Sequence, residues 1–220
     1  MIETIIPKTG LETIKLVIAD IVTNELTNQR TLAGATITPE LPAVPYIADP
    51  VYLEELESFF ASDGSLNLFI DKFNPVDDTE MNCILINPTR DTFENGSEKR
   101  MMAVAFYSIE VLAGSEAEDD EEADAKTNRI IQRISGAIKS ILQSPLYVRL
   151  GLAAGTISHR QVKERAFYTP QTNEAQSYNG ALISFEVEYD ENSVNNIPTD
   201  LLEKNISSVN GKYRIDTTDL

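Results

Sequence analysis

The side chains that most often perform acid–base or nucleophilic chemistry are scarce in this chain. It contains one histidine, His159, and one cysteine, Cys83. A lone histidine can act as a general base, but no glycine-flanked serine accompanies it as a nucleophile. His159 lies in a loop-like stretch, which favours a loop or interface role, and Cys83 lies in an apolar strand pattern typical of a buried, inert thiol. A single cysteine forms no internal disulfide, so nothing requires an oxidising compartment.

Carboxylates are abundant and they cluster. Residues 115–124 (SEAEDDEEAD) hold seven acids in ten positions, which suits either a divalent-cation site or a solvated charged loop. Calcium loops place their ligands at fixed offsets around a turn glycine, and this run has neither feature, so the solvated loop is favoured. Neither the Rossmann nor the P-loop glycine spacing occurs. We therefore expect no catalytic residue, no cofactor and no metal, in a protein that is not an enzyme.

The net charge limits the classes of partner that this chain could bind. The 220 residues include 18 bases and 35 acids, a net charge of −17. This charge argues against sequence-independent DNA binding and against an anionic membrane surface as partner. No apolar run reaches the roughly 18 residues that a membrane span needs, and we recognise no signal peptide. We therefore expect no membrane contact.

The charge is also unevenly distributed. Eight bases and one acid give residues 125–166 a net charge of +7, so the remainder of the chain carries −24. Either this basic flank lies against acidic segments of the same chain, or it meets the acidic flank of a neighbouring subunit. The second arrangement is a head-to-tail contact, which closes into a ring when the rotation permits.

The ring arrangement assigns the charged residues to two sides of the subunit. The cationic side would comprise Arg129, Arg133, Arg149, Arg160, Lys163 and Arg165. The anionic side would comprise Glu116, Glu118, Asp119, Asp120, Glu121 and Glu122.

Apolar periodicity in the first part of the chain predicts helices. Thr9-Gly10-Leu11-Glu12 fits a capping box and opens a predicted helix over 10–29. Residues 31–80 form an acidic, proline-rich insertion. Within it, Asp49-Pro50 predicts the start of a short helix that ends near Gly64, and 65–73 is either a strand or a loop.

The second half of the chain predicts a sheet. A strand that starts at Cys83 and ends at Asn87-Pro88 pairs with a strand over 99–112 in an antiparallel hairpin. A helix follows the acidic run and closes at Ser144-Pro145, because a residue before proline avoids the helical region. Two further strands are predicted, over 160–168 and 181–189. Residues 191–220 are predicted to be an extended arm with a short helix near 199–205.

These elements predict an α+β fold, with helices on one face of a mostly antiparallel sheet. We expect residues 1–190 to form a single domain that includes the insertion at 31–80. The arm at 191–220 would lie outside this domain.

Residues 124–190 resemble the tail-completion proteins of tailed bacteriophages, the family of tail terminators and head–tail joining proteins of the neck. An amphipathic helix ends in residues 141–146 (ILQSPL), and the loop Leu150-Gly151-Leu152 follows. A strand then runs into 165–170 (RAFYTP), and an alternating strand ends in 185–189 (FEVEY). The leading helix and the hairpin fit the same tail-terminator-like fold.

The resemblance implies a virion structural protein, made in the host bacterial cytoplasm. Family members form six- or twelve-fold rings beside portal, adaptor or tail proteins, and DNA passes through the lumen without sequence-specific binding. A lumen lined by carboxylates would repel phosphate, so we expect the loop at 115–124 to face it. The arm at 191–220 would reach into a neighbouring ring. The alternative is a monomeric acidic inhibitor or DNA mimic, and a metal-dependent enzyme ranks third.

Overall fold

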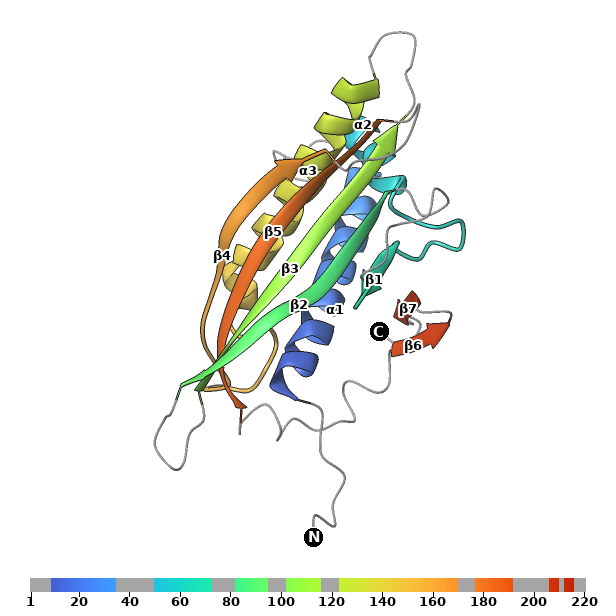
Figure 1. The fold of residues 1–220 in the computed structure, drawn as a ribbon. Helices are drawn as coiled ribbons and strands as arrows, with labels where there is room; N and C mark the ends of the chain where they lie inside the picture. The colour runs from blue at the N-terminus through green and yellow to red at the C-terminus, as the bar shows by residue number, and fades with distance from the viewer. Residues whose placement is uncertain are drawn as a thin grey trace.

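The protein has helices on one side of a mixed sheet, so the predicted α+β class is confirmed (Figure 1). Among the residues that the structure describes, seven strands form one sheet in the order β4-β5-β3-β2-β1-β7-β6. The structure is a computed structural model, and it describes residues 9–34, 50–72, 82–94, 102–115, 123–169, 177–191, 206–209 and 212–215.

The described elements have the following bounds. The helices are α1 (Gly10–Ala33), α2 (Pro50–Glu57), α3 (Ala123–Gln143) and a 3-10 turn, η2 (Pro145–Tyr147). The strands are β1 (Leu68–Ile70), β2 (Cys83–Glu94), β3 (Met102–Ser115), β4 (Ile157–Tyr168), β5 (Ser177–Asp190), β6 (Ile206–Val209) and β7 (Lys212–Ile215).

Helix α1 begins where the sequence predicts. The Thr9 hydroxyl accepts a hydrogen bond from the Glu12 backbone N–H at 3.3 Å, which is the hydroxyl half of the capping box. The helix runs past the predicted end at residue 29 because the next strong breaker is Gly34, whose N–H donates to the Arg30 carbonyl. Residues 13–19 are buried on every side, so this part of α1 is enclosed rather than laid along the surface.

Alternation along β3 and β5 separates a face toward the helices from a face away from them, which we call the open face because no described helix covers it. On the helix face, Tyr107 and Ile109 of β3 and Phe185 of β5 are at most 1% exposed, and they pack with α1 and α3 in the main core. On the open face, Val104, Phe106, Ser108, Glu110 and Leu112 of β3 are half-buried. The same 14-residue strand therefore meets two different environments.

The hairpin of β2 and β3 is antiparallel, as predicted, but β2 does not end at Pro88. It continues to Glu94 with a register shift between Pro88 and Arg90. Strand β1 pairs with β2, in parallel, only along 84–86, so beyond this point no described strand lies on that side of β2. A proline that lacks an N–H is tolerated at such an edge, particularly beside a bulge.

Parts of the predicted insertion belong to the main core. Leu56 of α2, Phe59 after it, and Leu68 of β1 are at most 4% exposed and pack in the same cluster as α1 and α3. Within the predicted arm, β6 and β7 pair with each other, and β7 joins β1 at the sheet edge. The helix expected at 199–205 lies outside the described residues.

Candidate interface surfaces

The groups considered first for catalysis lie apart. The loop predicted around His159 is wrong, because the residue is exposed on strand β4, opposite Glu188 of β5. Cys83 is fully buried on β2. Across the described ranges, no cluster of three or more His, Cys, Asp or Glu side chains is arranged to hold a metal ion. A shallow hollow between α1 and α2 is lined by Thr27, Arg30, Thr31, Gly34, Leu53 and Glu57.

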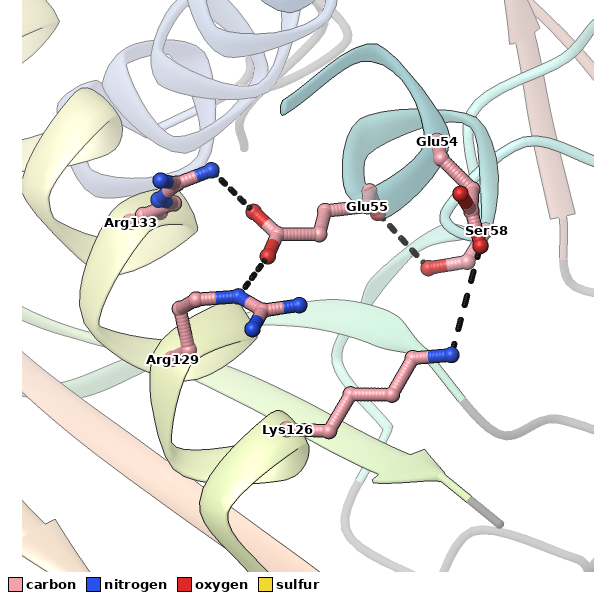
Figure 2. Close-up of polar contacts among 6 residues, drawn as sticks. All are labelled: Glu54, Glu55, Ser58, Lys126, Arg129 and Arg133. Carbon is pink, nitrogen blue, oxygen red and sulfur yellow. Dashed lines mark hydrogen bonds and ion pairs between the residues drawn. The ribbon is translucent and has the colours of Figure 1, made fainter. Parts of the chain in front are cut away.

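Two of the residues assigned to the cationic side bind a carboxylate of their own chain. Arg129 and Arg133 are four residues apart on α3, so their side chains leave the same face of the helix. That face meets α2, where Glu55 points toward both guanidinium groups (Figure 2). Arg129 Nε donates to Glu55 Oε1 at 2.5 Å, and Arg133 donates to Glu55 Oε2 at 3.0 Å. For these two residues, the structure favours the contact within one chain.

Burial makes this α2–α3 ion pair a structural contact. The Glu55 side chain is 2% exposed, whereas the two arginine side chains are 35% and 37% exposed. A buried carboxylate requires partners for both oxygens, and here each oxygen has one. Next to it, Lys126 lies 4.0 Å from Glu54, whose side chain is 75% exposed (Figure 2). That outer pair contributes little because water screens it.

The basic side chains on β4 also contact groups of their own chain. Arg160 donates to the Ser144 carbonyl at 2.5 Å, at the C-terminal end of α3, where a helix leaves carbonyl groups unpaired. Burial lowers the pKa of Arg160. Lys163 pairs with Glu186 at 2.9 Å, and Arg165 stacks on Phe167 with 4.9 Å from its guanidinium carbon to the ring centroid.

Arg149 differs from the other members of the predicted cationic side. Its side chain is exposed and has no hydrogen bond or ion pair with any residue that the structure describes, whereas its carbonyl accepts from the Leu152 N–H at 2.8 Å. The predicted anionic residues, by contrast, lie outside the described residues: Glu116, Glu118, Asp119, Asp120, Glu121 and Glu122. The structure therefore brings Arg129 and Arg133 together on Glu55 and leaves Arg149 apart from them.

The turn that carries Arg149 exposes two large apolar side chains. Leu146 is 84% exposed and Val148 is 56% exposed, directly after α3. Neither residue was predicted from the sequence to be a site residue. The available signal was the run Pro145-Leu146-Tyr147-Val148, which has more apolar residues than an ordinary surface loop requires.

The open face of the sheet holds a second feature that was not predicted from the sequence. Glu110 lies on β3 in register with Leu85 of β2 and Leu182 of β5, so its strand neighbours on this face are apolar. Burial raises the pKa of Glu110. No described residue forms an ion pair or hydrogen bond with its carboxylate. A glutamate within the strand pattern Ile109-Glu110-Val111-Leu112 was the sequence signal.

The fold and these surfaces define an α+β protein with one helix-covered sheet face and one open face. No protein-family model matches the chain, and no curated protein matches it significantly. Within the described part of the chain, no helix is long and apolar enough to cross a bilayer.

Proposed function

We propose that this chain is a virion structural protein that forms a ring in the neck or tail of a tailed bacteriophage. In this role it is a head–tail connector or tail terminator subunit that surrounds the DNA channel and joins neighbouring rings. It has no catalytic activity of its own. Its partners are further copies of itself and the adjacent portal, adaptor or tail proteins.

The observation that carries the proposal is the order of the described elements. Helix α1, the β2–β3 hairpin, helix α3 and strands β4 and β5 follow one another as the resemblance to tail-completion proteins requires. Strands β4, β5, β3 and β2 are neighbours in one sheet, with α1 and α3 on the same side (Figure 1). Such an arrangement supports an assembly role, because neither helix covers the far face of β3 and β5, whose side chains there are only half-buried.

Charge gives a second, independent support. A net charge of −17 suits a channel wall, since a surplus of carboxylates repels a passing duplex and keeps it from adhering. The helix side and the open side also differ in chemistry, and unlike surfaces on opposite sides of a subunit are what a head-to-tail ring needs.

The experiment is to locate the chain in purified virions by cryo-electron microscopy. A short tag on the C-terminus marks the chain, and a major capsid protein bearing the same tag serves as the control for tag visibility. Several copies in a ring around the DNA channel are expected. Absence of the chain from virions that show the control tag would overturn the proposal and favour an acidic inhibitor or DNA mimic.

A further inference from the structure

The turn after α3 is fixed by contacts on its core side, while two of its apolar side chains, Leu146 and Val148, are exposed. The Tyr147 hydroxyl donates to the Glu25 carboxylate of α1, and Leu150 is 1% exposed within the main core. Arg160 holds the Ser144 carbonyl at the other end of the turn. A turn fixed at these points presents Leu146, Val148 and Arg149 with little conformational entropy left to lose on binding.

The open face offers the complementary chemistry. Leu112 and Leu182 are half-buried on this face and can contact a partner. Leu85 lies beside them in a small apolar cluster with Phe69 and Cys83, all three at most 4% exposed, so this cluster is already buried in the single chain. Glu110 lies in register between Leu85 and Leu182 without a partner among the described residues. An unpaired carboxylate in apolar surroundings destabilises the isolated fold, and a cation brought in by a partner relieves that cost.

The two surfaces cannot meet within one molecule. The turn belongs to the helix side, because Tyr147 and Leu150 pack against the main core and Tyr147 contacts α1. The open face lies on the far side of the sheet, which separates it from both helices (Figure 1). A second copy of this chain, however, can bring its own turn to this face. That turn supplies two apolar side chains, Leu146 and Val148, and the unpaired side chain of Arg149.

We propose that the basic apolar turn of one copy (Leu146, Val148 and Arg149) docks on the open sheet face of a second copy, where Arg149 pairs with Glu110. This inference rests on the proposed ring function and names the contact that builds the ring. The contact is heterologous, since each copy offers its turn to one neighbour and its sheet face to the other. Repetition of one such contact gives a ring when the rotation closes.

Cysteine cross-linking between two copies tests the contact directly. One full-length chain carries Val148→Cys and a second carries Leu182→Cys, with different tags, in a Cys83→Ala background. Mixed under mild oxidation, they are expected to give a disulfide-linked pair that carries both tags. A matched mixture with Ser140→Cys in place of Val148→Cys, on an exposed position of α3, controls for random collision.

Charge reversal then tests the ion pair. Glu110→Arg in the sheet-face copy is expected to lower the cross-linking yield about tenfold, and Arg149→Glu in the turn copy is expected to restore it. Glu164→Arg, an exposed position on the same face of β4, is the matched control and is expected to leave the yield unchanged. A cross-linking yield no higher than that of the Ser140→Cys mixture would overturn the proposal.

Glu110→Gln keeps the test valid if charge reversal prevents folding. This variant is expected to weaken cross-linking and yet to increase the free energy of unfolding, a combination that a merely structural glutamate does not give. The outcomes also separate the two proposals. A ring in virions without this cross-link removes the contact alone, whereas the cross-link in a chain absent from virions removes the phage function alone.

Discussion

The two sides of the sheet place their carboxylates in opposite electrostatic settings. On the helix side, Glu55 is 3% exposed, and each of its oxygens accepts a hydrogen bond from an arginine of α3. On the open side, Glu110 is half-buried among leucines and has no described partner. The Glu55 carboxylate therefore stabilises the fold, whereas the Glu110 carboxylate makes no described contact that would stabilise it.

The largest expected effect contrasts the two faces of β3 at adjacent positions. Ile109 is fully buried on the helix face, so Ile109→Ala removes apolar contacts and leaves a cavity. We expect the free energy of unfolding to fall by about 4 kcal/mol, measured by urea denaturation. Ser108→Ala, on the half-buried open face, is the control, with an expected change within about 0.5 kcal/mol. Equal losses for the two variants would show that the faces are not distinct.

Loss of the buried carboxylate should have the next largest effect. Glu55→Ala leaves Arg129 and Arg133 without their shared partner, and we expect a loss of about 3 kcal/mol, at the lower end for a broken buried pair because both arginines are partly exposed. The neighbouring variant Glu54→Ala removes an exposed carboxylate and should cost less than about 1 kcal/mol. Thermal or urea unfolding of the two variants side by side checks this. Similar losses would contradict the structural role of Glu55.

A smaller effect is expected where a tyrosine hydroxyl partners a carboxylate on the helix side. Burial and the hydrogen bond to Glu25 raise the pKa of Tyr147 to about 12. Because the folded-state pKa is raised, the stabilisation is complete below the ordinary tyrosine pKa of about 10 and disappears as the pH rises through about 12. Tyr147→Phe should therefore cost about 1 kcal/mol at neutral pH. Its difference from the wild type should shrink in alkaline urea titrations, and a pH-independent difference would refute this assignment.

The smallest expected effect has the opposite sign. Burial raises the pKa of Glu110, so its ionised form destabilises the folded chain. The wild type is favoured below the ordinary carboxyl pKa and loses stability as the pH rises through the raised value. Glu110→Gln should increase the free energy of unfolding at neutral pH by about 0.5 kcal/mol, a small gain because water still screens this half-exposed group. Urea unfolding at about pH 4 and about pH 7.5 checks the trend, and a gain at acidic pH alone would contradict it.

Sequence patterns located most of the helix-side structure. Six apolar residues of α3 recur at three- and four-residue spacing, the pattern of one helix face, and all six are buried: Ile130, Ile131, Ile134, Ile138, Ile141 and Leu142. The start of α1 at its Thr9 cap and the end of α3 before Pro145 also agree with the prediction. These features succeeded because each depends on residues within one or two turns of one another.

Features that depend on distant residues were harder to predict. Pro88 signals a strand end by itself, and only the place where β1 ends along β2 makes it tolerable within β2. The three-residue strand β1 has too short a pattern to distinguish from a loop. Strands β6 and β7 have four residues each, which is too short a pattern to separate them from the polar segment around them.

The sequence by itself determined the fold class, the helix faces and the strong charge asymmetry, since composition and local periodicity encode all three. The tertiary structure alone decided which charges are used. Arg129 and Glu55 are 74 positions apart, and no spacing rule predicts their contact. No spacing rule shows either that the side chains of Arg149 and Glu110 have no partner among the described residues, or that Leu85 and Leu182 are the register partners of Glu110. Pairing and burial depend on three-dimensional proximity, which the linear pattern does not contain.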